Sequence, residues 1–302
     1  MFPMRHIVRA RIARQLAVAV VLCMCGGFAV FGQGYKPMER PRFMDRIDEK
    51  EGARKIEAFR NQRLEGDYCF RFELEHLPRR GATETYHGVM WGSWNAEGPV
   101  TRVVLQKAPE GNGANAEKEK LELIVRNGPN PRIWERSGGE DMFEEISGKQ
   151  LFDPLLPGIV YTPFHLQMPF IYWQEYEYEG PDRIRSRVGQ QFLMFPPADS
   201  EAEQSGIKAV RIAVDDAYNA LLQVEVIDAG GAERSRVTVE SFKKAQGQYI
   251  VKSIELTDNE SHDRTRFRVR AASLGLELPQ AMFDADSPER PPELKASDFD
   301  SI

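Results

Sequence analysis

The stretch PFHLQMPFIYWQEYEYEGPDRIRSRVGQQFLMFPP, residues 163–197, is the most informative part of the chain. It opens with an aromatic-rich apolar run, 164–173, which contains Pro169. Alternating glutamates and tyrosines follow over 175–179, a pattern typical of a strand with one solvated face. We expect a turn at Gly180-Pro181 and a second strand beyond it. No catalytic signature interrupts the stretch, so it predicts a sheet that carries an apolar insertion.

Residues 1–32 have the pattern of a secretory signal peptide. A basic segment with four arginines and no acidic residue precedes an uncharged apolar region, 16–31. Val30 and Gly32 have the small or permissive side chains that favour cleavage before Gln33. Because the apolar region is shorter than the ~18–20 residues that span a bilayer, a retained anchor is the weaker alternative. We therefore expect a periplasmic protein exported through a cleaved signal, with outer-membrane association left open.

The three cysteines bear on anchoring and on disulfides. Lipid attachment at Cys23 or Cys25 is disfavoured, because Leu22 and Met24 stand where a small residue usually precedes a lipid-modified cysteine. Only Cys69 remains after cleavage, so the mature chain has no partner for an intramolecular disulfide. We expect this cysteine to be a buried strand residue.

Composition and charge restrict the class of function. Cleavage would change the formal net charge from −6 to −10, because four arginines leave with the signal. An acidic chain repels nucleic acid and anionic lipid headgroups at long range, so we predict no nucleic-acid partner. The remaining chain of about 270 residues can bury one core as a single sheet-rich domain.

The spacing of apolar residues changes once along the mature chain. Residues 33–42 are polar and contain proline, as expected of a tether, and residues 43–64 have the spacing of one amphipathic helix ended by Gly66. Apolar and polar residues then alternate, which predicts antiparallel strands joined by short turns. The expected strands are 70–75, 86–94, 100–106, 121–125, 133–134, 183–195, 208–214, 221–228, 234–243, 248–258 and 264–272. The polar loop 109–120 is expected to be mobile, and the acidic, proline-rich tail 284–302 is expected to be disordered.

Residues 147–173 interrupt this alternation. Pro154, Pro157, Pro163 and Pro169 forbid one long helix, so we expect short helical turns and loops. The segment is too apolar to lie in water. We therefore predict that it covers a concave apolar surface, as one wall or as a lid.

Taken together, residues 43–283 resemble the outer-membrane lipoprotein-sorting protein family, whose members are similar to the periplasmic lipoprotein carrier LolA and its receptor LolB. Besides the signal and the amphipathic helix, the matching strings are TPFHLQMPFIYW, YEGPDRIRSRVGQQFLMFPP, VRIAVDDAYNALLQVEVIDAGG and VTVESFKKAQGQYIVKSIELTD. The resemblance implies a mainly β (α+β) fold. This fold is an unclosed antiparallel β-barrel, or half-barrel, with an N-terminal amphipathic helix and short helices covering the concave face.

The resemblance also implies a function. Such a protein would be an exported, non-enzymatic carrier or receptor that binds acyl chains in an apolar cavity and uses no cofactor. Its partners would be lipid-modified protein or free lipid, and a membrane-associated donor or acceptor protein. Periplasmic sensors of a sigma-factor regulatory system share the fold, so a module that binds a partner protein is the alternative. The loop 109–120 and the acidic tail depart from a minimal carrier.

One set of aromatic side chains exceeds what a thin helix-on-sheet core requires. A lipid site would be concave and mostly apolar, with few polar groups. A large core is the alternative reading of the same residues. We predict that the following residues line the acyl-chain cavity: Phe70, Phe72, Trp91, Trp134, Phe164, Phe170 and Trp173.

Acidic and histidine residues form no pattern typical of an enzyme or a metal site. Glu175, Glu177 and Glu179 share one face of one strand, which favours a solvated edge over the paired carboxylates of a glycosidase. Asp215-Asp216 lie in an expected turn, and the mature histidines lack metal-ligand spacing. No GxSxG motif follows a strand. We predict no catalytic and no metal residues, and a hydrolase on a β scaffold is the least favoured alternative.

Overall fold

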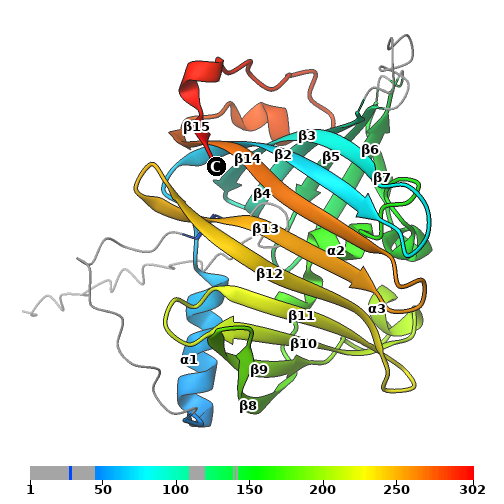
Figure 1. The fold of residues 1–302 in the computed structure, drawn as a ribbon, viewed down its shortest axis with the longest axis vertical. Helices are drawn as coiled ribbons and strands as arrows, with labels where there is room; N and C mark the ends of the chain where they lie inside the picture. The colour runs from blue at the N-terminus through cyan, green and yellow to red at the C-terminus, as the bar shows by residue number, and fades with distance from the viewer. Residues whose placement is uncertain (1–26, 29–44, 109–119, 139, 141) are drawn as a thin grey trace, which may run out of the picture.

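The computed structural model describes residues 27–28, 45–108, 120–138, 140 and 142–302. Within these residues the chain forms one extended antiparallel sheet with a few short helices (Figure 1). The predicted tether and the predicted signal peptide, apart from Gly27–Phe28, lie outside the described residues, as does 109–119 of the polar loop.

The sheet has a strand in every range that the alternating pattern predicted, although a hairpin turn divides the predicted strand 183–195. Its strands are β1 (Gly27–Phe28), β2 (Asp67–Leu77), β3 (Glu84–Asn95), β4 (Gly98–Lys107), β5 (Lys120–Arg126), β6 (Arg132–Ser137), β7 (Glu144–Ile146), β8 (Tyr176–Ile184), β9 (Arg187–Met194), β10 (Ile207–Asp215), β11 (Leu221–Asp228), β12 (Glu233–Ala245), β13 (Gln248–Asp258), β14 (Arg264–Leu276) and β15 (Asp300–Ser301). They pair in the order β7-β6-β5-β4-β3-β2-β14-β13-β12-β11-β10-β9-β8, with β1 beside β13 and β15 beside β14. In the described part of the chain β7 and β8 are the two free edges, so the predicted unclosed half-barrel is confirmed.

The helices are short and lie mainly on the inner face of the sheet. They are α1 (Glu49–Arg60), η1 (Gly148–Phe152), α2 (Pro163–Gln167), η2 (Pro169–Tyr172), α3 (Glu201–Gln204), η3 (Gln280–Phe283) and η4 (Ala296–Asp298). Figure 1 shows α2 behind β12–β14 and α1 beside β10 and β11.

Helix α1 is amphipathic, as predicted, but shorter than the predicted range 43–64. Asp48 caps its start by accepting a hydrogen bond from the backbone N–H of Glu51 at 2.7 Å. Ile56 and Phe59 are buried in the core on the inner face of the sheet. The helix ends at Arg60 rather than near Gly66, and residues 43–44 lie outside the described part.

Strand β2 illustrates how alternation builds the two faces of the sheet. Phe70, Phe72 and Leu74 point to the inner face and belong to the main core. Cys69 points the other way, is 1% exposed, and pairs in register with Trp91 of β3. The prediction of a buried strand cysteine is confirmed, and burial raises the pKa of the Cys69 thiol to about 12.

The predicted turn at Gly180-Pro181 is wrong. Both residues lie inside β8, at a register shift between Tyr178 and Gly180. Gly180 has φ 118°, which accommodates the bulge, and β8 is an edge strand, where a proline costs no ladder hydrogen bond on its free side. The hairpin turn lies instead at Arg185-Ser186, where Arg185 has φ 56°.

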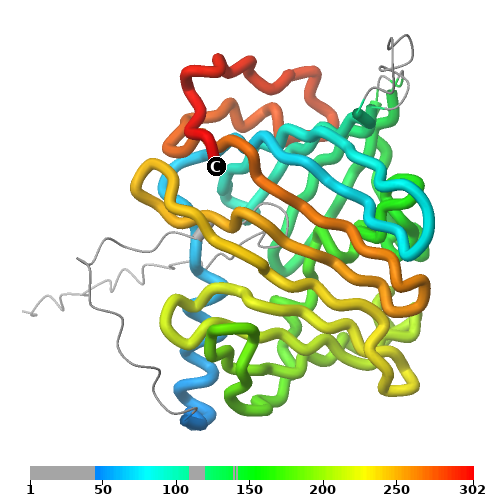
Figure 2. Tube along the Cα trace, in the orientation of Figure 1, coloured from blue at the N-terminus to red at the C-terminus, as the bar shows by residue number. Residues whose placement is uncertain are grey.

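The C-terminal segment 284–302, predicted to be disordered, packs against the sheet instead. β15 pairs with β14, and the backbone N–H of Ile302 donates to the carbonyl of Arg270 at 3.0 Å. The buried Arg102 guanidinium donates to the carbonyls of Met282 and Glu289, both at 2.7 Å. Composition alone does not reveal such anchors, which lie far away in sequence. The sheet domain therefore continues past its predicted end at 283, and Figure 2 shows this segment over the end of the sheet, beyond β14.

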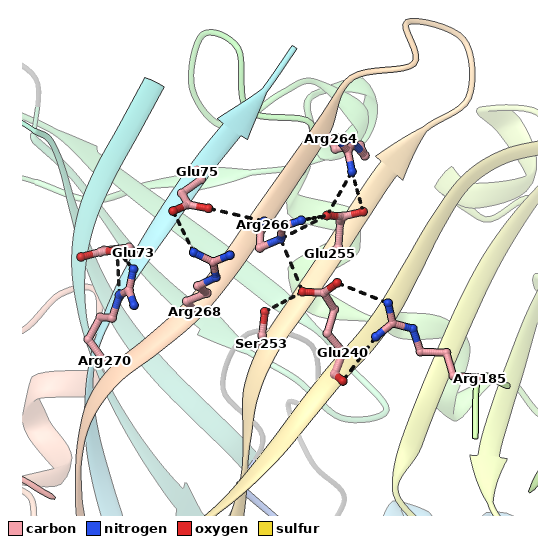
Figure 3. Close-up of polar contacts among 10 residues, drawn as sticks. All are labelled: Glu73, Glu75, Arg185, Glu240, Ser253, Glu255, Arg264, Arg266, Arg268 and Arg270. Carbon is pink, nitrogen blue, oxygen red and sulfur yellow. Dashed lines mark hydrogen bonds and ion pairs between the residues drawn. The ribbon is translucent and has the colours of Figure 1, made fainter. Parts of the chain in front are cut away.

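The outer face of β2, β14, β13 and β12 has an ion-pair ladder (Figure 3). Arg266 of β14 donates to Glu255 of β13 at 2.6 Å, and Arg268 donates to Glu75 of β2 at 3.0 Å. The ladder comprises Glu73, Glu75, Arg185, Glu240, Glu255, Arg264, Arg266, Arg268 and Arg270. Such partly exposed pairs contribute little stability each, but they keep this face polar.

Candidate functional site

The insertion 147–173 covers the inner face where the half-barrel is open. It contains η1, α2 and η2, and it is irregular, as its prolines predicted. Pro163 and Pro169 start α2 and η2, where a missing N–H costs nothing. Met168 lies between these helices with φ 46° and reverses the chain direction.

A cleft of about 640 Å³ lies at this opening, between the insertion and the two edges of the sheet. One side is formed by the β5–β6 turn, β6 and β7, and the other by the segment that follows β9 and starts α3. Its lining residues are Pro129, Pro131, Arg132, Glu145, Ile146, Ser147, Leu151, Phe152, Phe164, Gln167, Pro169, Tyr172, Trp173, Gln174, Glu175, Phe195, Pro196, Pro197, Ala198, Ser200, Glu201 and Ala202. The volume lies within the range of ~300–1,000 Å³ typical of small-molecule sites.

Aromatic rings connect the cleft to the core. The ring centroids of Phe152 and Phe164 are 5.2 Å apart, those of Phe164 and Phe170 5.7 Å, and those of Phe170 and Trp173 6.3 Å. These distances are typical of favourable aromatic pairs. The aromatic side chains of the insertion therefore form one continuous apolar row that fills the hollow of the sheet.

Side chains at the ends of β5 and α1 hold the insertion in place by hydrogen bonds to its backbone. The side-chain amide of Asn127, at the end of β5, donates to the carbonyls of Leu166 and Gln167, both at 2.8 Å. Arg60 of α1 donates to the carbonyls of Ile171 at 2.7 Å and Trp173 at 3.0 Å. Both contacts satisfy carbonyls at helix ends that the short helices leave without intrahelical partners.

The structure divides the seven predicted cavity residues into three groups. Phe164 and Trp173 line the cleft. Phe70, Phe72 and Phe170 are 1–2% exposed inside the main core and do not line it. Trp134 and Trp91 pack on the opposite face of the sheet, in or against an outer cluster formed with the C-terminal residues Leu278, Met282 and Phe283.

Several cleft residues were missed by the analysis of the sequence. Leu151, Phe152 and Tyr172 belong to the insertion but were not among the predicted cavity residues. Phe195 and the prolines at 129, 131, 196 and 197 flank strand ends on both sides of the opening. A possible signal was the position of these proline pairs, since proline concentrates where strands end at an exposed edge.

The rim of the cleft is acidic. Arg132 and Glu145 form an ion pair in which the Arg132 Nε donates at 2.8 Å, and this hydrogen bond lowers the pKa of Glu145. Glu175 and Glu201 line the other side. The rim therefore has three carboxylates and one guanidinium.

His165 of α2 contacts a serine hydroxyl, an arrangement that could suggest catalysis. Its Nδ1 accepts from the backbone N–H of Thr162 at 3.3 Å, which places the ring proton on Nε2. Nε2 lies 3.1 Å from the Ser235 Oγ of β12 and therefore donates to it. Burial, and then the charge of Arg234, lower the pKa of His165 to about 4. In this tautomer the imidazole cannot take the Ser235 proton, so the pair joins the insertion to the sheet rather than activating a nucleophile.

Glu179 and Asp215, two of the acidic residues considered for catalysis or metal binding, have structural partners. Glu179 pairs with Arg211, with an Nη2 to Oε1 distance of 3.0 Å. The Asp215 carboxylate accepts from the backbone N–H groups of Ala217 and Tyr218 and from Arg187 at 2.8 Å. Over the described residues, no group of three or more His, Cys, Asp or Glu side chains could hold a metal ion. Nor does any described helix have the length and apolarity to cross a membrane.

The chain is similar to known proteins in its fold but not in its sequence. No protein-family model matches the chain, and no curated protein sequence matches it. The chain is similar to the crystal structure of a DUF1329 family protein from Desulfovibrio piger, with a TM-score of 0.60 and 12% identity over 73% of this chain and 90% of that one. A domain named for outer-membrane lipoprotein sorting, from Vibrio parahaemolyticus, has a TM-score of 0.60 and 14% identity over 72% and 89% of the two chains. A LolA superfamily protein from Nitrosomonas europaea has a TM-score of 0.52 and 11% identity over 74% and 91%. The unclosed antiparallel sheet of this chain is therefore the LolA-like fold.

Proposed function

We propose that the protein is an exported, non-enzymatic carrier or receptor for acyl chains, either of free lipid or of lipid-modified protein. The observation that supports the proposal is the apolar cleft at the opening of the half-barrel, continuous with the aromatic rings of the insertion. The fold relatives named for lipoprotein sorting agree with it. The pattern of residues 1–32 supports a periplasmic location.

The mechanism follows from what occupies the hollow of the sheet. Phe164, Phe170 and Trp173 fill it, so an acyl chain can enter the hollow only if these rings move aside. An acyl chain that enters the cleft gains ~0.8 kcal/mol for each buried CH₂ group. Displacement of the insertion would let the chain replace these aromatic side chains in the hollow. Transfer to an acceptor would depend on the difference in affinity between the two proteins.

The test is binding of a fluorescent fatty-acid probe to the purified mature protein and its variants. Trp173→Ala removes one wall of the cleft and should change the dissociation constant of the probe. Trp91→Ala, on the outer face, is the matched control. It should lower the free energy of unfolding but leave the dissociation constant of the probe unchanged. Phe170→Ala should mainly cost stability, ~3–5 kcal/mol, because this ring is 1% exposed. Absence of saturable binding to the wild-type protein would exclude the carrier function.

A further inference from the structure

The outer face of the sheet has one apolar hollow that the lipid proposal does not use. Ala213 and Leu222 form a small cluster with Ile184, whereas their chain neighbours Val214 and Leu221 belong to the main core. Successive strand residues point to opposite faces, so this cluster lies on the outer face. A hollow of about 320 Å³, hereafter the outer hollow, lies over it.

The rim of the outer hollow is aromatic and exposed. Among the described residues, the exposed large hydrophobic side chains are Met142, Tyr218 and Tyr249. Tyr218 is 47% exposed and Tyr249 42%, and both border the outer hollow together with the half-buried Phe242. Exposed tyrosines around an apolar floor are the composition of a protein-binding hot spot. At about 320 Å³, the outer hollow suits a large side chain of a partner better than a whole lipid.

The charges around the outer hollow are mainly positive, although the chain is acidic overall. The Arg187 guanidinium lies over the rings of Tyr218 at 5.1 Å and Phe242 at 5.4 Å, and Asp215 holds it there. The Lys244 ammonium lies 6.0 Å from the Tyr249 ring centroid. A guanidinium held on aromatic rings still has N–H donors for a carboxylate. Because the side chain is already ordered, little conformational entropy is lost when a partner binds.

Arg185 completes the rim and is free to change partner. It is 56% exposed at the tip of the β8–β9 hairpin, and it contacts Glu240 through two long hydrogen bonds, 3.4 Å to the backbone carbonyl and 3.5 Å to the carboxylate. Figure 3 shows that Glu240 also accepts from Ser253, at 2.9 Å, and pairs with Arg266 at 3.4 Å. The Glu240 charge therefore stays compensated when Arg185 turns towards another carboxylate. The positive φ of Arg185, which favours glycine or asparagine, is a further unusual feature of this position.

From this geometry we infer that the outer hollow is a docking site for an acidic segment of a partner protein, with an apolar side chain seated between Tyr218 and Tyr249. Arg185 and Arg187 would pair with its carboxylates, and the floor of Ile184 and Leu222 would bury its apolar group. The inference does not depend on the lipid proposal, because the outer hollow and the cleft lie on opposite faces of the sheet and share no lining residue.

The experiment uses fluorescently labelled nonapeptides in which Asp and Glu flank a central Leu, Phe or Trp, and a matched set in which Lys replaces the acids. We expect saturable binding of the acidic set, measured by anisotropy, that weakens as salt concentration rises. Arg185→Glu and Tyr218→Ala should each weaken it about tenfold or more. Arg54→Glu makes the same charge change on the exposed side of α1 and should leave binding unchanged. Trp173→Ala should also leave peptide binding unchanged, which separates this site from the lipid cleft.

Three results would overturn the inference. One is the absence of saturable binding for every acidic peptide at millimolar concentration. Another is equal binding of the acidic and basic sets, or acidic binding that neither Arg185→Glu nor Tyr218→Ala weakens. The last is co-sedimentation with phosphatidylglycerol vesicles that Arg185→Glu abolishes while peptides do not bind, which would assign the surface to a membrane instead.

Discussion

Replacing Asn127 by alanine should loosen the insertion and tighten lipid binding. Asn127 is 2% exposed, and its amide provides both hydrogen bonds from β5 to the end of α2. Each bond contributes about 1 kcal/mol net, and the two carbonyls would be left buried without this donor. The Oδ1 atom of Asn127 has no hydrogen-bond partner, so its removal offsets part of the cost. We expect the free energy of unfolding to fall by about 2 kcal/mol.

The same change should raise apparent affinity if the insertion must move for lipid to enter. Weakening the closed state by about 2 kcal/mol relative to an open state that lacks these bonds increases the open population up to about 30-fold. The dissociation constant of a fatty-acid probe should fall by up to this factor, measured by titration beside urea denaturation. Asn259→Ala is the control, because the Asn259 amide also donates two hydrogen bonds, both to Glu233, away from the cleft. An Asn127→Ala protein that loses stability while its probe affinity stays at the wild-type value would refute a moving insertion.

Three further predictions concern the tail, pH and the cysteine. Arg102→Met should lower the free energy of unfolding by about 3–5 kcal/mol, because it leaves the buried Glu122 carboxylate with Arg136 as its one cationic partner. It should also speed proteolysis within 284–302, since Arg102 holds the carbonyl of Met282. An unchanged digestion rate would contradict the anchoring role. The pKa of His165 is lowered from 6.5 in the unfolded chain to about 4 in the folded protein. As pH falls from 6.5 to 4 the unfolded chain therefore binds the proton first, and up to about 3 kcal/mol of the free energy of unfolding is lost over this pH range. Denaturation at pH 7 and pH 4 should show a smaller pH effect in His165→Gln, and equal effects would exclude the assignment. Cys69, buried and with its pKa raised to about 12, should react with a thiol reagent only in denaturant, and rapid labelling of the native protein would contradict its place in the sheet.

The sequence predicted the strands well because one face of the sheet is buried. Residues such as Phe70 and Phe72 must alternate with polar ones once one face packs on a core, and this period is visible without a structure. The irregular insertion was equally predictable, because its prolines exclude a long helix. The bulge at Gly180 was not, since a glycine followed by a proline is compatible with a turn and with an edge-strand irregularity alike.

The candidate site was only partly predictable, because strand periodicity does not say which face encloses the cavity. Trp91 and Trp134 have the same residue types as the inner aromatics, but they lie on the outer face under Leu278, Met282 and Phe283. No helix or strand was predicted after residue 272, so nothing in the prediction could cover an apolar outer face. Phe164 and Trp173 line the cleft because they belong to the insertion itself.

Photoaffinity labelling with a diazirine-bearing fatty acid, followed by peptide mapping, tests the central claim most directly. The account predicts crosslinks that excess palmitate competes away, on cleft residues such as Leu151, Tyr172, Trp173 and Phe195. Labelling confined to the outer face around Trp91, or labelling that palmitate does not reduce, would contradict an acyl-chain site at the opening of the half-barrel.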